Sequence, residues 1–240
     1  AGVYNVVTGR GSVIGDALTL HPEISHITFT GSVETGKRVM HSAAEHVASV
    51  TLELGGKSPV VVLRDADISA AVEGTLKAIF MNAGQVCSAG SRLVIERAVH
   101  GEMMEKLVAA TEALELGHGL ADPPLGPVIS PDQRSLIAGF VDDARARGIE
   151  VATGGANAEV PGFEQGCFYQ PTILDQVDAL FVNLIIGMDQ HLTRIGIDNE
   201  LRSVRGPHGP APGAVQIEHM GGLSLLDIKE THTHLIVVGA

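Results

Sequence analysis

The stretch SHITFTGSVETGKRVMHSAAEHVASVTLEL, residues 25–54, places a β-branched run, an amphipathic segment and a second apolar run in direct succession. Residues 25–31 and 49–54 are typical of short strands. Residues 32–47 are typical of a helix, with Ser32 as its N-cap. This order is expected of a βαβ unit around a parallel sheet, so the sequence predicts an α/β layer fold.

The same alternation continues on both sides of this stretch. Toward the N-terminus, residues 3–7 predict a buried strand, and the next segment predicts a short helix stopped by Pro22. Toward the C-terminus, the turn at 55–58 leads into further elements. We expect strands at 59–63, 91–96, 150–155 and 166–174, and helices at 65–81, 101–114 and from Ser130-Pro131 onward. The strands at 25–30, 49–54 and 59–63 are expected to pair with one another, and their open apolar edges to promote association.

Charge and composition exclude several classes of function. The net charge of −12, without a Lys/Arg run, disfavours nucleic acid and anionic membranes as partners. Neither a signal-peptide pattern nor an apolar run of about 18 residues is found, so we expect a cytoplasmic protein that does not enter membranes. Cys87 and Cys167, the two cysteines, form no Cys-x-x-Cys pair, which fits a reducing compartment.

The composition changes near residue 179. Five of the eleven histidines lie in residues 180–240, where 206–213 reads as a Pro/Gly connector and 220–240 predicts one or two strands. His232 and His234 would share a face of such a strand, as metal ligands can. Because no third ligand lies near them in the sequence, we predict no metal site.

Three features carry chemistry, and each has a structural alternative. A strand runs into Gly31 and Ser32 and then a helix, whose free N–H groups could bind a phosphate; the alternative is an ordinary glycine turn. Glu53 ends an apolar strand, where desolvation would make it a better general base; the alternative is an outward position on an edge strand. Cys87, in FMNAGQVCSAGSR (residues 80–92), could be a nucleophile whose own N–H stabilises an oxyanion, or an inert buried thiol.

Together these features resemble the NAD(P)-dependent aldehyde dehydrogenase superfamily. The resemblance rests on HPEISHITFTGSVETGK (21–37), VTLELGGKSPVVVLRDADI (50–68) and FMNAGQVCSAGSRLVIE (80–96), in the order and spacing of the family. It continues through LGPVISPDQ (125–133) and GGANAEVPGFEQGCFYQPTIL (154–174), and so covers roughly residues 1 to 178. The implied fold is a truncated aldehyde dehydrogenase-like α/β fold.

The resemblance implies two catalytic residues. Cys87 looks like the nucleophile that forms a thiohemiacetal with an aldehyde, which becomes a thioester after hydride transfer. Glu53 looks like the general base that activates water to release the carboxylate. The substrate implied is a small-molecule aldehyde.

The resemblance also implies a cofactor site for NAD or NADP. Gly31 and Ser32 match the helix end that receives the pyrophosphate, and Gly36 matches a glycine later in the same motif. The carbonyl of Leu54 matches a contact to the nicotinamide carboxamide.

The implied domains are the end of the cofactor-binding domain at 1–53 and part of the catalytic domain at 54–179. Family members are longer, so we expect the first βα units, with a second oxyanion donor and a ribose-binding lysine, to be missing. We assign no domain to residues 180–240. Their different composition would follow from a shifted reading frame, a fused segment or a gene-model artefact. Two alternative functions stay open: a catalytically impaired remnant, and a cofactor-independent ester or thioester hydrolase. A homo-oligomer is left open as well.

Overall fold

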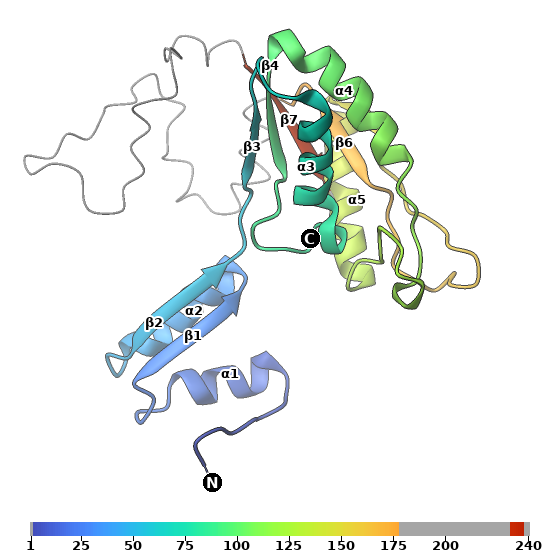
Figure 1. The fold of residues 1–240 in the computed structure, drawn as a ribbon. Helices are drawn as coiled ribbons and strands as arrows, with labels where there is room; N and C mark the ends of the chain where they lie inside the picture. The colour runs from blue at the N-terminus through green and yellow to red at the C-terminus, as the bar shows by residue number, and fades with distance from the viewer. Residues whose placement is uncertain (1, 178–230, 238–240) are drawn as a thin grey trace, which may run out of the picture. The chain divides into compact units, whose positions relative to one another are not determined.

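The computed structural model describes residues 2–177 and 231–237 (Figure 1). It divides into two compact units, the first ending at Gly56 and the second beginning at Lys57. Both units combine helices with parallel strand pairs, so the predicted α/β class is confirmed. No helix in the described ranges is long and apolar enough to span a membrane.

The first unit contains the predicted βαβ motif. Its elements are helix α1 (Gly11–Thr19), strand β1 (His26–Gly31), helix α2 (Val33–Ala44) and strand β2 (Ser49–Leu54). Strands β1 and β2 are parallel, with His26 opposite Ser49 at one end and Gly31 opposite Leu54 at the other. Apolar residues alternate with polar ones along both strands, and α2 packs against the sheet through Gly36, Val39 and Ala43. The sheet thus has one half-buried face and one polar face.

The prediction of a buried strand at residues 3–7 is wrong. This segment forms no strand, and Val3 and Tyr4 are almost fully exposed. A β-strand needs a neighbouring strand to satisfy its backbone N–H and C=O groups. No described strand pairs with this segment, so its apolar composition alone does not make it a strand.

The second unit is built on a five-stranded sheet in the order β3-β4-β7-β6-β5. Its strands are β3 (Pro59–Val62), β4 (Arg92–Glu96), β5 (Glu150–Thr153), β6 (Thr172–Asp175) and β7 (Thr231–Val237). Its helices are α3 (Ile68–Phe80), α4 (Arg97–Glu112) and α5 (Pro131–Ala146), with short 3-10 turns η1 (Met81–Gly84) and η2 (Gly119–Ala121). Only the β3–β4 pair is parallel, so this sheet is mixed.

The expected pairing of residues 59–63 with the two earlier strands is also wrong. Strand β3 pairs with β4, to which it is connected through α3. A parallel pair needs a crossover of about a dozen residues or more. The short turn at 55–58 cannot provide one, whereas α3 can.

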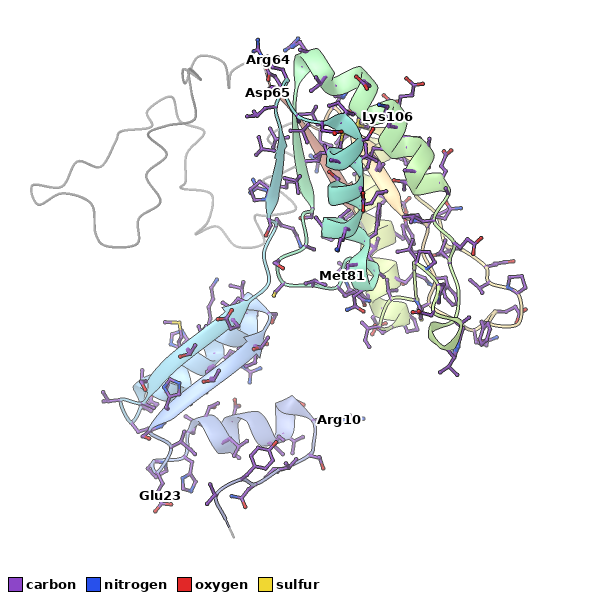
Figure 2. All side chains as sticks on the ribbon, in the orientation of Figure 1. Arg10, Glu23, Arg64, Asp65, Met81 and Lys106 are labelled. Atoms are coloured by element: carbon purple, nitrogen blue, oxygen red, sulfur yellow. The ribbon has the colours of Figure 1, made fainter. Side chains whose placement is uncertain are left out.

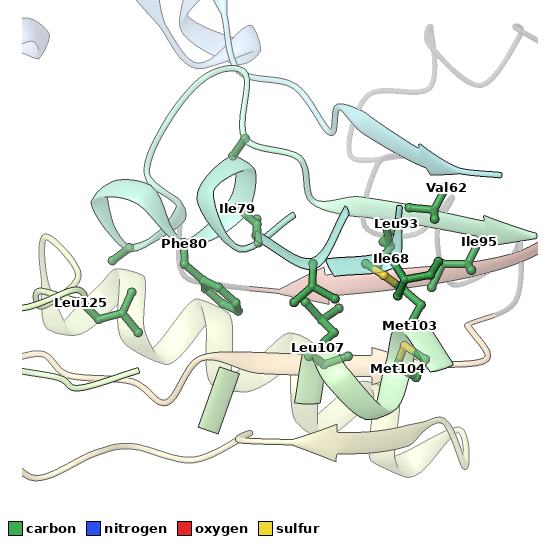
Figure 3. Packing of buried hydrophobic residues seen from close by; sticks show 14 residues of the cluster. Val62, Ile68, Ile79, Phe80, Leu93, Ile95, Met103, Met104, Leu107 and Leu125 are labelled. Carbon is green, nitrogen blue, oxygen red and sulfur yellow. The ribbon is translucent and has the colours of Figure 1, made fainter. Parts of the chain in front are cut away.

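The main core of the second unit lies between α3, α4 and the sheet (Figure 3). Leu93 and Ile95 of β4 are fully buried there, as are Met103 and Leu107 of α4. Ile79 and Phe80 close the core at the end of α3. The end of α3, from which the Cys87 segment continues, is therefore fixed by packing.

The last described element bears out the expectation of a strand near the C-terminus. Strand β7 lies between β4 and β6 and is antiparallel to both. The predictions for residues 180–230, including the connector at 206–213, lie outside the described residues.

Candidate functional site

The parallel pairing of β1 and β2 brings several predicted residues to one sheet edge. Gly31 lies opposite Leu54 and Thr30 lies opposite Glu53, all at the carboxyl ends of the two strands. Ser32 follows Gly31 directly and caps α2. In open α/β sheets, ligands bind outside the carboxyl ends of the strands. The first unit therefore gathers Gly31, Ser32, Glu53 and Leu54 at an edge that suits a ligand.

The N-terminus of α2 is capped by the side chain of Ser32. Its Oγ accepts a hydrogen bond from the Thr35 N–H at 3.2 Å, and its carbonyl accepts one from the Gly36 N–H at 2.9 Å. The N–H groups of Val33 and Glu34 precede the first intrahelical bond and can bind an anion together with the helix dipole. The Glu34 carboxylate in the same turn opposes an anion, so a bound phosphate has to lie away from that side chain.

Gly36 lies on the buried face of α2. It is buried, and a Cβ at this position would lie 2.8 Å from Leu54 Cδ2 and 3.6 Å from Leu52 Cδ1. Glycine here lets α2 approach β2 closely. This packing positions the helix N-terminus beside the end of β2.

Glu53 is exposed, whereas its neighbours Leu52 and Leu54 are half-buried. Its side chain therefore belongs to the polar face of the two-stranded sheet. This position matches the outward-facing alternative considered for Glu53 and not the desolvated one. The carboxylate is accessible to water and solutes, and its role as a base stays a prediction.

Cys87 lies in a segment that leaves the end of α3 through a tight turn. Figure 2 shows Met81, the first residue of that turn, at the end of the helix. Cys87 and Ser88 are exposed, whereas Ala83 and Ala89 are buried in the main core and Val86 packs against it. Cys87 is therefore no buried core residue. Its thiol is presented to solvent by a segment whose flanks are anchored.

The backbone around Cys87 also offers a hydrogen-bond donor. No described residue accepts a hydrogen bond from the Cys87 N–H, whereas the neighbouring Val86 and Ala89 N–H groups bond to Gly84 and Val86 carbonyls at 2.9 and 3.0 Å. A donor next to a thiol is the arrangement that stabilises an oxyanion formed by attack of that thiol.

Three polar residues around this segment were missed by the sequence analysis. Asn82 and Gln85 bond to each other's backbone carbonyl, each at 3.1 Å. Arg92 holds the other flank, since its Nε donates to the Lys57 carbonyl at 2.7 Å and its N–H to that of Ser58 at 3.2 Å. In the sequence, these three residues are marked only by being polar among small and apolar neighbours.

The predicted residues fall into both units. Glu53 and the cofactor residues belong to the first, and Cys87 belongs to the second. Their joint action on one substrate is therefore a proposal. Among the residues that the structure describes, no three His, Cys, Asp or Glu side chains form a group that could hold a metal ion.

A model of the aldehyde dehydrogenase family matches residues 1–181. The betaine aldehyde dehydrogenase of Bacillus subtilis is 41% identical over 179 residues, which are 74% of this chain and 36% of that protein. The D-glyceraldehyde dehydrogenase (NADP(+)) of Picrophilus torridus is 39% identical over 193 residues, 78% of this chain and 38% of that protein. The chain thus spans little more than a third of the length of these relatives.

Solved structures give the same result. The betaine aldehyde dehydrogenase of Staphylococcus aureus in complex with NAD+ superposes with a TM-score of 0.69 at 38% identity, over 72% of this chain and 34% of that one. An NAD+ complex of aldehyde dehydrogenase from Bacillus cereus superposes with a TM-score of 0.67 at 37% identity, over 71% and 34%.

Proposed function

Because the chain belongs to the aldehyde dehydrogenase family, we propose that it supplies the nucleophile, the water-activating carboxylate and part of the cofactor site for NAD(P)+-dependent oxidation of an aldehyde to a carboxylate. The exposure of Cys87 on an anchored segment, within a family match that spans residues 1–181, carries the proposal. Aldehyde dehydrogenases of both cofactor types are among the relatives, so NAD+ and NADP+ are both candidates.

Cys87 acts first in this proposal. Its sulfur attacks the aldehyde carbon, and the carbonyl oxygen takes up negative charge that the Cys87 N–H is placed to stabilise. Removal of the former aldehyde hydrogen as hydride leaves an acyl group on sulfur as a thioester. Gly90, beyond Cys87, is buried, and a Cβ there would lie 2.6 Å from Val60 Cγ2, so this glycine lets the segment after Cys87 pack closely on the core.

Glu53 acts second. Its exposed carboxylate can take a proton from a water molecule, and the resulting hydroxide equivalent attacks the thioester carbonyl. The carbon–sulfur bond then breaks, which releases the carboxylate product and regenerates the Cys87 thiol.

The α2 terminus fits a dinucleotide pyrophosphate. The N–H groups of Val33 and Glu34 donate to no described residue and can bind such a group beside the Ser32 cap. Gly31 leads the chain into this terminus, and the Phe29 ring fills the space where a Cβ of Gly31 would lie. The Leu54 carbonyl at the adjacent strand end can accept a hydrogen bond from a carboxamide, and buried Gly36 supports both by packing α2 on β2. NAD(P)+ would supply the hydride acceptor when bound.

The two structural units agree with a separate cofactor-binding part and catalytic part. We assign residues 1–53 to the cofactor-binding part and residues 54–179 to the catalytic part. The structural boundary at Gly56 and Lys57 lies close to the proposed one.

An assay of the purified chain tests the proposal. NAD+ or NADP+ is combined with a panel that includes betaine aldehyde and glyceraldehyde, and the absorbance of the reduced nicotinamide is followed. We expect aldehyde-dependent reduction that Cys87→Ser abolishes and Cys167→Ser leaves intact. Hydrolysis of an activated ester is measured beside it. Ester hydrolysis without nicotinamide reduction would support the hydrolase alternative, and a folded chain inactive in both assays would support the impaired remnant.

A further inference from the structure

Gln85 makes a hydrogen bond with each end of its side-chain amide. Its Nε2 donates to the Asn82 carbonyl at 3.1 Å, and its Oε1 accepts from the Ile129 N–H at 2.8 Å. In return, Asn82 Nδ2 donates to the Gln85 carbonyl at 3.1 Å. One half-buried side chain therefore ties together both ends of a turn and attaches the turn to a distant segment.

The turn that Gln85 holds has an unfavourable backbone. Asn82, Ala83 and Gly84 have φ angles of 53°, 55° and 78° in succession. For Asn and particularly for Ala this left-handed conformation is strained, and such residues persist only where the surroundings fix them. Burial of Ala83 and the reciprocal Asn82–Gln85 bonds supply that fixation.

The distant segment is itself firmly held. Val128, next to Ile129, is buried, and its N–H donates to the Cys167 carbonyl at 2.9 Å. Val128 packs with Ile137 and Val141 of α5 and with Tyr169 in a second core cluster. Gln85 thus connects the turn before Cys87 to a part of the core to which α3 does not belong.

We propose that Gln85 is a positioning residue that sets the orientation of the Cys87 thiol and N–H by clamping the strained turn to residue 129. The inference rests on the proposed role of Cys87 as the nucleophile. Cys87 follows Gln85 by two residues, and Val86 between them packs against the main core. A rotation of the turn at Gln85 is therefore transmitted directly to Cys87.

Two substitutions separate the functions of the Gln85 amide. Gln85→Met keeps the length of the side chain and removes both hydrogen bonds, whereas Gln85→Glu keeps an oxygen that can accept from the Ile129 N–H. Gln165→Ala is the matched control, because Gln165 is exposed and makes no described hydrogen bond.

The test uses the full chain and combines hydrogen exchange, alkylation and turnover. In Gln85→Met we expect exchange of the hydrogen-bonded Gln85 and Val86 amides to rise about tenfold. We also expect kcat for aldehyde to fall ten- to a hundredfold with KM little changed, since small misplacements carry such losses. Gln85→Glu should restore a large part of the protection from exchange and a large part of kcat. Iodoacetamide labelling, resolved by peptide, should change at Cys87 and stay unchanged at half-buried Cys167.

The outcomes distinguish this inference from the proposed function. Unchanged exchange and alkylation at Cys87 in Gln85→Met would overturn it, as would equal changes at Cys167, which would indicate general unfolding. A Gln85→Glu variant no better than Gln85→Met would also overturn it. A wild-type chain without nicotinamide reduction would count against the proposed function alone, because exchange and alkylation still report on the clamp.

Discussion

At the residue scale, the exposure of single side chains determines which chemistry they can perform. Cys87 is exposed in a segment flanked by buried Ala83 and Ala89, so packing holds the backbone while the sulfur stays accessible. Glu53 is exposed at a strand end, where a carboxylate can reach water. The two residues thus have the accessibility that their proposed roles require.

Replacing Glu53 by Gln should separate the two half-reactions. Without the carboxylate, attack by Cys87 and oxidation still occur, but general-base activation of water is lost, which slows deacylation by roughly 10²- to 10⁴-fold. We expect a rapid burst of about one reduced nicotinamide per chain, followed by slow turnover, in stopped-flow absorbance measurements.

The control for this experiment is Glu23→Gln, an exposed glutamate of the same unit that is labelled in Figure 2. It should behave like the wild type. Loss of the burst itself in Glu53→Gln would contradict a role confined to deacylation.

At the scale of elements, the packing of α2 on β2 depends on one missing side chain. Gly36→Ala would place a Cβ 2.8 Å from Leu54 Cδ2, which forces the helix or Leu54 to move. Because the atom that has to move is the end of the half-buried Leu54 side chain, we expect Gly36→Ala to be less stable than a glycine-to-alanine change in open space by about 1 kcal/mol in the free energy of unfolding. Chemical denaturation should show this loss, and weaker NAD(P)+ binding should accompany it.

Gly15→Ala is the matched helical control in the same unit. Gly15 lies in α1, and a Cβ added there would meet no heavy atom of another part of the chain within 4 Å. Alanine there should stabilise the chain by about 0.4–1 kcal/mol through a less flexible unfolded state. If Gly36→Ala and Gly15→Ala were equally stable, close packing of α2 on β2 would not explain why residue 36 is a glycine.

An ion pair joins the ends of β3 and β4. Buried Glu96 forms a salt bridge with the Arg64 guanidinium and accepts the Arg64 N–H at 2.7 Å (Figure 2 labels Arg64). The hydrogen bond from the Arg64 side chain lowers the pKa of Glu96 below its ordinary value of 4.5. The native state therefore releases this proton more readily than the unfolded chain does.

The stability contributed by this pair should depend on pH. It is fully present above about pH 4.5, the ordinary pKa, and is lost as the pH falls through the lower pKa of the folded state. Urea denaturation should find Glu96→Gln less stable than the wild type at neutral pH, with the difference shrinking in acid. Glu102→Gln, which breaks the exposed pair with Lys106, should change stability by less than about 1 kcal/mol. A difference for Glu96→Gln that grew in acid would refute this linkage.

At the scale of the whole molecule, exposed apolar residues favour self-association. Val3, Tyr4, Val6 and Val7 are all exposed within one short stretch. Exposed apolar groups of this kind promote contacts between chains. Sedimentation velocity should show a weight-average mass that rises with concentration, and serine at these four positions should reduce the rise. A Leu120→Ser variant, at an isolated exposed position of the second unit, should not. A compact monomer at every concentration would contradict the prediction.

Most elements could be predicted because their signals are local. Ser32, Asp67 and Ser130 each cap the following helix through a side-chain oxygen, and the alternation in β1 and β2 reports which face is buried. The segment at 3–7 has the composition of a strand but no partner strand, so its composition gave a wrong prediction. The pairing of β3 with β4 followed from connection length, a global constraint that apolar composition does not encode.

The α/β class, the βαβ unit at 26–54 and the family could all be inferred from the sequence, because spacing, caps and signature residues are properties of the chain. The three-dimensional structure was needed to show that Gly31 and Leu54 share a sheet edge, that Glu53 and Cys87 are exposed, and that Gln85 reaches Ile129. The sheet edge and the Gln85 bond are contacts between residues far apart in the chain, and exposure depends on which distant segments cover a side chain. They arise from packing and register, which fix positions in space that no local pattern of side chains specifies.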